Sequence, residues 1–338
     1  MLLRGKFRII IEESRNRAVW PNINVPRCSW QIRYEHANQD LRNTNTMVTN
    51  NDRSLSRRDA LKIGSACTAA WLSGGLLSAG AAEAKDDPYG GFKMGVQSYS
   101  LRGFDGKTAL KHTRTLGLEY WESFPRHIPM STLPKHIQKH KTLLEDAGVT
   151  VMAYGVLPFD DNETKARQAF DFAKAMGIVS LSANPQKNNK TFDLLDRMVE
   201  EYDVAIAIHN HGPNAKYDKI SDVTSIVKDR HPKIGACVDT GHFIRSDEDP
   251  VEALERLSDR LFGVHLKDVK TVVEGDKRTK HFTILGQGDL DVPACLKLLK
   301  KLDYQYCLAL EYEENPDNPL SDIEVCLQVV RDAVAGLK

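Results

Sequence analysis

Four strand-like apolar runs of this chain each end on a side chain that can bind a divalent metal. The runs 204–208, 234–238, 261–264 and 306–310 are followed, in this order, by His209, Asp239, His265 and Glu311. Short apolar runs of this kind are typical of buried parallel strands. In a parallel α/β barrel, side chains at the carboxyl ends of the strands meet on one face. Two imidazoles and two carboxylates can therefore converge there, which predicts one mixed nitrogen and oxygen metal site.

Three more polar residues follow these strand ends closely enough to reach the same face. His211 and Lys267 each lie two residues after a predicted histidine ligand, and His242 lies three residues after the predicted aspartate ligand. His211 is expected to contact a substrate or to support the site. Lys267 either places a cation beside substrate oxygens or is a solvated loop lysine. His242 either binds substrate or makes local hydrogen bonds in a loop.

Two polar residues end earlier strand-like runs. Glu122 is the candidate for a second acid or base, and an ion pair to Arg126 or Arg102 is the alternative. Gln97 ends the first run and is expected to offer hydrogen bonds to a substrate.

The elements that would position these residues alternate along the chain from about residue 92. Strand-like runs lie at 93–98, 118–123, 149–155, 178–183, 204–209, 234–239, 261–266 and 306–312. Helical patterns are clearest at 132–147, 162–176, 191–202, 221–229, 250–258, 292–302 and 320–334. Eight strands, each followed by a helix, predict a (β/α)8 TIM barrel. A doubly wound open sheet is the alternative, but it usually has a glycine-rich turn after its first strand, unlike Gln97-Ser98-Tyr99-Ser100.

A long charged insertion, 267–291, follows the seventh predicted strand and ends in Gly286-Gln287-Gly288-Asp289. In a barrel, a loop at this place lies over the active face. We therefore expect the insertion to be able to close on a substrate.

Composition narrows the class of partner. Lys plus Arg and Asp plus Glu number 46 each, so the formal net charge is zero and no nucleic-acid surface is expected. No apolar run is long enough to predict a stable membrane anchor. The cysteines are widely spaced without a C-x-x-C pair, which does not indicate a disulfide framework, and Cys237 and Cys307 are expected to be buried thiols.

The N-terminal part differs in kind from the rest. Ser56-Arg57-Arg58-Asp59-Ala60-Leu61-Lys62 precedes a small and apolar run that ends in Ala82-Glu83-Ala84. This pattern resembles a bacterial twin-arginine export signal at 47–84. Residues 1–46 are interpreted as a mis-called start or a disordered extension, and 85–338 as the barrel. We expect a mature protein that begins near Lys85, is exported by the twin-arginine machinery and is periplasmic or extracytoplasmic.

Six motifs in fixed order carry a resemblance to a known superfamily. They are Val96-Gln97-Ser98-Tyr99-Ser100-Leu101-Arg102, His209-Asn210-His211-Gly212, Val238-Asp239-Thr240-Gly241-His242, Val264-His265-Leu266-Lys267-Asp268, Gly286-Gln287-Gly288-Asp289 and Leu310-Glu311. Over about residues 92–335 the chain resembles the xylose-isomerase-like TIM barrels. These include ketose 3-epimerases, inosose dehydratases, hydroxypyruvate isomerases, dehydroshikimate dehydratases and apurinic endonucleases.

The resemblance implies a role for each predicted ligand. Epimerase-like members bind one divalent metal, and the matching positions here are His209, Asp239, His265 and Glu311, with Mn2+, Co2+, Zn2+ or Mg2+ as the cation. His209 stands where many relatives have a glutamate that also acts as a base, so it is a ligand, the base, or both. Glu311 is expected to act as ligand and as acid or base. Substrate hydroxyls would contact His242.

The implied chemistry begins with removal of a proton next to a carbonyl. A metal stabilises the resulting enediolate as a Lewis acid, while positioned side chains move protons. The leading hypothesis is a metal-dependent isomerase or epimerase acting on an unphosphorylated sugar or keto sugar. The alternative is a lyase, dehydratase or hydratase on keto sugars or keto-cyclitols. A non-catalytic sugar-binding protein is a third candidate, and a homo-oligomer stays open. Repair of abasic DNA is disfavoured because it needs extra histidine ligands on the second and third strands.

Overall fold

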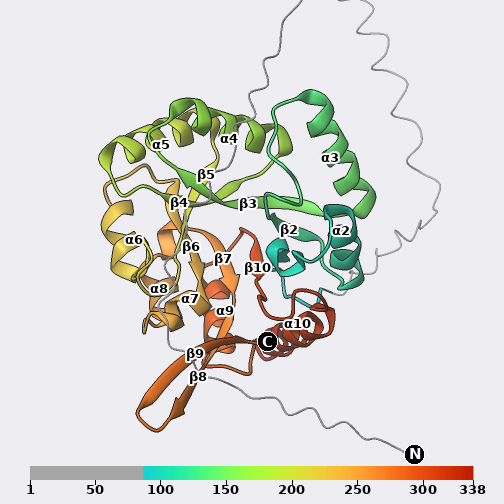
Figure 1. Ribbon diagram of the computed structural model, residues 1–338, viewed down its shortest axis with the longest axis vertical. Helices are drawn as coiled ribbons and strands as arrows, with labels where there is room; N and C mark the ends of the chain where they lie inside the picture. Colours follow the sequence, from blue (N-terminus) through green and yellow to red (C-terminus); the bar gives the residue numbers. More distant parts are fainter. Residues whose placement is uncertain (1–86, 338) are drawn as a thin grey trace, which may run out of the picture. The chain divides into compact units, whose positions relative to one another are not determined.

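Eight parallel strands close into a barrel in the computed structural model, which describes residues 87–337 (Figure 1). Around the barrel the strands follow the order β1-β10-β7-β6-β5-β4-β3-β2. They are β1 (Met94–Gln97), β2 (Tyr120–Ser123), β3 (Thr150–Phe159), β4 (Ser180–Pro185), β5 (Ala205–His209), β6 (Ile234–Asp239), β7 (Leu261–Leu266) and β10 (Leu308–Leu310). The predicted (β/α)8 TIM barrel is confirmed. The predicted extension at 1–46 and the predicted export signal at 47–84 lie outside the described residues.

Helices surround the barrel and connect its strands (Figure 1). They are η1 (Ser98–Leu101), α2 (Gly106–Thr115), α3 (Pro134–Ala147), α4 (Glu163–Met176), α5 (Asn189–Tyr202), α6 (Ile220–Val227), α7 (Thr240–Arg245), α8 (Pro250–Arg256), η2 (Ser258–Arg260), α9 (Val292–Lys301) and α10 (Leu320–Ala335). Periodicity had indicated all the longer ones except α2. Within residues 87–337, none of these helices has the length and apolar character needed to cross a membrane.

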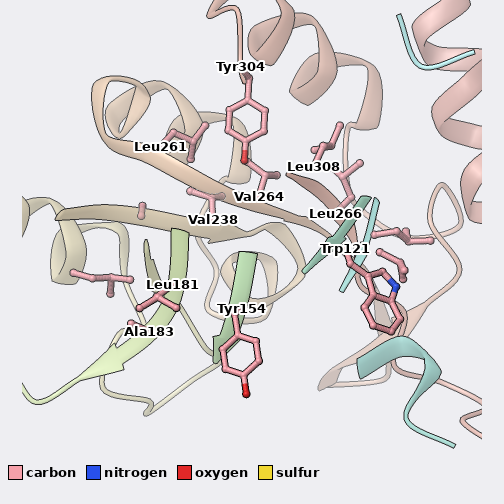
Figure 2. Packing of buried hydrophobic residues seen from close by; sticks show 14 of the residues in the cluster. Trp121, Tyr154, Leu181, Ala183, Val238, Leu261, Val264, Leu266, Tyr304 and Leu308 are labelled. Atoms are coloured by element: carbon pink, nitrogen blue, oxygen red, sulfur yellow. The ribbon is translucent and has the colours of Figure 1, made fainter. Parts of the chain in front are cut away.

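Side chains alternate between the two faces of each strand, and the side chains that face the lumen are on the whole smaller than those that face the helices. In β6, Cys237 packs inside the barrel with Ala205, Ala207 and Phe262. Its neighbour Val238 belongs instead to the large apolar cluster between strands and helices. Figure 2 shows part of that outer cluster, with Val238, Val264, Leu266 and Leu308 near Tyr304. The strands therefore face the helices with large apolar side chains and fill the lumen mainly with small ones.

The insertion after β7 contains a β-hairpin, which sequence patterning did not indicate. Strand β8 (Asp268–Glu274) pairs antiparallel with β9 (Lys277–Thr283), and the ribbon projects from the barrel (Figure 1). The turn contains Gly275 with φ of 59°, a conformation that glycine adopts without strain. At the base of the hairpin, the Phe282 ring lies 5.6 Å from the His242 ring. The base thus borders the predicted site, and closure on a substrate remains a prediction.

Asp268 holds the return from the hairpin to the barrel. Its buried carboxylate accepts backbone N–H bonds from Gly286 at 2.8 Å, Gly288 at 3.0 Å and Leu290 at 3.0 Å. Gly288 is needed for this approach, because a Cβ atom there would lie 2.3 Å from the Asp268 carboxylate. Asp268, which follows β7 closely, therefore holds the Gly286-Gln287-Gly288-Asp289 motif in place through hydrogen bonds.

Candidate metal centre

The four predicted ligands converge at the carboxyl end of the barrel. One donor atom from each of His209, Asp239, His265 and Glu311 lies within 4.8 Å of the others. The Nδ1 atom of His265 is 2.9 Å from Glu311 Oε2, 3.0 Å from His209 Nε2 and 3.7 Å from Asp239 Oδ2. The His209 Nε2 to Asp239 Oδ2 distance is 3.5 Å. Donors bound at roughly 2.0–2.2 Å to one tetrahedral cation lie about 3.3–3.6 Å apart, close to these spacings.

Two features of the cluster fit a divalent cation. The His209 and His265 nitrogens face each other at 3.0 Å, a contact in which two lone pairs point to the same place unless a proton separates them. Asp239 Oδ2 is buried and lies near both imidazoles, 3.5 Å from His209 Nε2 and 3.7 Å from His265 Nδ1. A buried carboxylate oxygen beside two imidazole nitrogens is a donor set suited to a metal. This donor set suits Zn2+, Co2+ or Mn2+, and Mg2+ is compatible with its oxygens.

Lys267 lies within the centre rather than in solvent. Its Nζ is 2.9 Å from Asp239 Oδ2, 2.9 Å from Glu311 Oε2 and 2.6 Å from Glu313 Oε1, and the residue is 3% exposed. Burial alone would lower the pKa of Lys267, but the three carboxylates raise it, so the side chain is a fixed cation. Glu313 was not predicted. Its place two residues after Glu311, on the same face of an extended segment, was the available signal.

His211 and His242 stand together beside the cluster. Their rings are 5.3 Å apart, and His211 Nδ1 is 3.4 Å from His209 Nδ1. Burial, with nearby positive charge, lowers the pKa of His211 to about 4 and that of His242 to about 2. Both imidazoles are therefore neutral at physiological pH, and each has one ring nitrogen that can accept a hydrogen bond.

Arg245 is a neighbour of the site that sequence reasoning missed. Its guanidinium nitrogen Nη1 is 3.1 Å from His242 Nδ1, and the guanidinium carbon lies 5.0 Å from the centre of the Phe282 ring. Arginine has only N–H donors, so His242 Nδ1 accepts this bond. Arg245 is the last residue of α7 and lies six residues after Asp239. No spacing rule singled it out.

Glu122 and Gln97 lie on the opposite side of His265 from the other ligands. Glu122 Oε2 is 2.8 Å from His265 Nε2, and Gln97 Nε2 donates to Glu122 Oε1 at 2.9 Å. The alternative ion pairs of Glu122 do not form, since Arg102 and Arg126 bind the backbone carbonyls of Glu313 and Arg102. The structure thus brings every predicted site residue into one connected group.

The four cysteines in the described part of the chain are free and buried, as expected for Cys237 and Cys307. Cys237 lies one layer below Asp239 and, with His209 and His265, forms a second buried group of ligand-type side chains. Burial raises the pKa of the Cys237 thiol, which disfavours the thiolate that a metal would need. The N2O2 cluster is therefore the better metal candidate.

Comparisons with known proteins agree with the fold. A model of the xylose isomerase-like TIM barrel family matches residues 110–329. Inosose dehydratase of Clostridium perfringens is 31% identical over 272 residues, which cover 68% of this chain and 85% of that protein. Inosose dehydratase of Mesomycoplasma hyopneumoniae is 24% identical over 258 residues, with 65% and 84% covered.

Solved structures share the fold. The IolI protein, crystallised with a bound zinc atom, is 19% identical, with a TM-score of 0.59 over 73% of this chain and 99% of that one. A xylose isomerase-like TIM barrel protein of Mycobacterium smegmatis in complex with magnesium is 16% identical, with a TM-score of 0.54 over 68% and 89%.

Proposed function

Because the chain belongs to the xylose isomerase-like TIM barrel family, we propose that it is a metal-dependent lyase that removes water from a polyhydroxylated ketone. The observation that carries the proposal is the convergence of two imidazoles and two carboxylates beside a buried lysine and two neutral histidines. The names of the relatives, inosose dehydratases, support a keto-cyclitol or a keto sugar as substrate.

The metal would be held by His209, Asp239, His265 and Glu311. When bound, a divalent cation supplies Lewis-acid stabilisation of the negative charge that develops on a ketone oxygen. Lys267 adds a second positive charge at the same place, fixed by its carboxylate partners. Preorganised charge of this kind stabilises a transition state without reorganisation during the reaction.

Elimination of water needs one proton removed next to the ketone and one delivered to the departing hydroxyl. We assign the first role to His211, which is neutral, more exposed than His209 and His242, and adjacent to the ligand cluster. The C–H electrons form the new double bond, and the hydroxyl on the next carbon leaves as its C–O bond breaks. The imidazolium formed at His211 can return its proton to that hydroxyl, so that water is released.

Isomerisation or epimerisation, the leading hypothesis from the sequence, is the second candidate. It shares the first step, and the same cluster supports it. Epimerisation also needs an acid or base on the other face of the substrate carbon. Glu122 would have to serve, but both of its oxygens are already hydrogen-bonded, to Gln97 and to His265. This observation favours elimination.

We also propose that the enzyme acts outside the cytoplasm on an unphosphorylated substrate. The support is the arginine pair Arg57-Arg58, followed by a small and apolar run. A carbohydrate and the export machinery are the partners that this proposal implies.

Incubation of the purified protein with Mn2+ or Co2+ and an inosose, in D2O, tests the reaction class. Elimination yields a product that has lost one water, which NMR and mass spectrometry detect. Asp239→Asn should lose both metal and activity, by about 10²-fold or more in rate. A product of unchanged formula would establish isomerisation or epimerisation instead. Full turnover by the metal-free protein would overturn the metal assignment.

A further inference from the structure

A series of hydrogen bonds connects the backbone of Tyr99, through Gln97 and Glu122, to His265 in the candidate metal centre. The Tyr99 backbone N–H donates to Gln97 Oε1 at 3.1 Å, which orients the Gln97 amide. The Gln97 Nε2 atom therefore faces Glu122 and donates to its Oε1 at 2.9 Å. The second oxygen of Glu122 lies 2.8 Å from His265 Nε2.

Each member of the series is fixed by more than one contact. Tyr99 belongs to η1, whose N-terminal cap is Gln97 itself, so helix and amide orient each other. Gln97 and Glu122 are also register partners on the paired strands β1 and β2. Both are 1% exposed, and His265 is fully buried. The Glu122 carboxylate is thus enclosed, and each of its two oxygens already has a hydrogen-bond partner.

We propose that Glu122 is a positioning residue that orients His265 for metal binding, with Gln97 and the Tyr99 backbone holding Glu122 in place. An ionised carboxylate can only accept, so His265 donates from Nε2 and presents Nδ1 to the cluster. Nδ1 is the atom that lies 2.9 Å from Glu311 Oε2 and 3.0 Å from His209 Nε2. The inference rests on the metal centre proposed above. It replaces the acid or base role that the strand-end position of Glu122 predicts.

This arrangement also gives Gln97 a different role from the predicted one. A glutamine that binds substrate would affect the Michaelis constant and leave the metal untouched. A glutamine that orients Glu122 instead affects the affinity for the metal, through the Gln97–Glu122 and Glu122–His265 hydrogen bonds. Gln97→Met removes the donor at nearly constant volume, so it separates the two roles.

Titration with Co2+ against a competing chelator tests the proposal on the whole chain. Glu122→Gln should weaken Co2+ affinity about 10- to 100-fold and change the visible absorption of the bound cobalt, as loss of a carboxylate behind a ligating histidine does. Gln97→Met should weaken affinity by about 2- to 10-fold, which corresponds to one net hydrogen bond. Glu255→Gln, an exposed change on α8, is the matched control and should match the wild type.

The opposite pattern would overturn the proposal. If Glu122→Gln keeps wild-type Co2+ affinity and absorption but loses deuterium exchange into a keto substrate, Glu122 is an acid or base. If Gln97→Met binds Co2+ normally and only raises the Michaelis constant, the series of hydrogen bonds does not act on the metal. Thermal midpoints of the variants identify any loss of fold, and Gln97→Met decides the question should Glu122→Gln not fold. Wild-type protein without Co2+ affinity would overturn the metal centre and this inference together, whereas the D2O assay reports on the reaction class separately.

Discussion

His242 shows how neighbours can hold a single side chain in one charge state. It is buried, accepts a bond from Arg245 at Nδ1 and lies 3.4 Å from the Lys267 ammonium at Nε2. Burial and the adjacent positive charge lower its pKa to about 2, whereas an unfolded histidine has a pKa near 6.5. Between these values the unfolded chain binds a proton that the folded protein does not. The contribution of His242 to the free energy of unfolding is therefore at its maximum above about pH 6.5 and decreases as the pH falls below that value.

His242→Asn should remove that part of the pH dependence. Asparagine can still accept from Arg245 but does not titrate. Between pH 6 and pH 5 the wild type should lose about 1 kcal/mol more unfolding free energy than the variant, because one pKa unit corresponds to about 1.4 kcal/mol. Urea denaturation at pH 7, 6 and 5 measures the difference. Parallel curves for the two proteins would show that His242 is not kept neutral by the fold.

For single residues, the sequence predicted which side chains lie at the site better than it predicted the contacts between them. Each of the four candidate ligands lies within one residue of the end of a short apolar strand, and strand ends converge in a barrel, so His209, Asp239, His265 and Glu311 were recognisable. The contact of Glu122 with His265 joins residues that are 143 positions apart. It depends on how the barrel closes and on side-chain rotamers, which spacing along the chain does not encode.

Among the elements, the segment after β7 departs most from expectation. Sequence indicated a charged insertion over the active face, and the structure has a hairpin whose base carries Phe282 against His242 and Lys267. Alternation is masked in β9, where Lys277 and Arg278 put charge on both faces, and Val272 interrupts it in β8, so the period-2 signal is weak. Eight barrel strands were predictable because each is buried on both faces and bounded by a helix or a glycine.

Asp268→Asn should loosen the return from this hairpin. The carboxylate accepts N–H bonds at both oxygens, and an amide would turn a donor toward at least one of those N–H groups. We expect a loss of about 1–3 kcal/mol of stability, the usual cost of an unsatisfied buried donor. Thermal unfolding measures the loss, and hydrogen exchange at 284–290 should accelerate.

A matched change in the hairpin turn provides the control. Asp276→Asn alters an exposed residue beside Gly275 and should leave both stability and exchange unchanged. Equal behaviour of the Asp268 and Asp276 variants would mean that the Gly286-Gln287-Gly288-Asp289 segment is held by other contacts.

For the molecule as a whole, the predicted route of export can be tested through residues outside the described part. Arg57→Lys with Arg58→Lys should leave full-length precursor in the cytoplasm, because the twin-arginine pair is the feature that such signals present to their machinery. Cell fractionation followed by immunoblotting measures the distribution. Arg53→Lys, just upstream, is the control and should be exported normally. Normal export of the double variant would contradict the twin-arginine assignment.

The order of strands around the barrel has a consequence for assembly. Strand β10 is the last one in the chain, yet it lies between β1 and β7 and brings Glu311 to the centre. The fourth ligand therefore arrives only when the C-terminal strand inserts and the ring of strands is complete. A molecule in which β10 has not yet paired would therefore offer only three of the four candidate donors, and it would bind a divalent cation more weakly than the closed barrel.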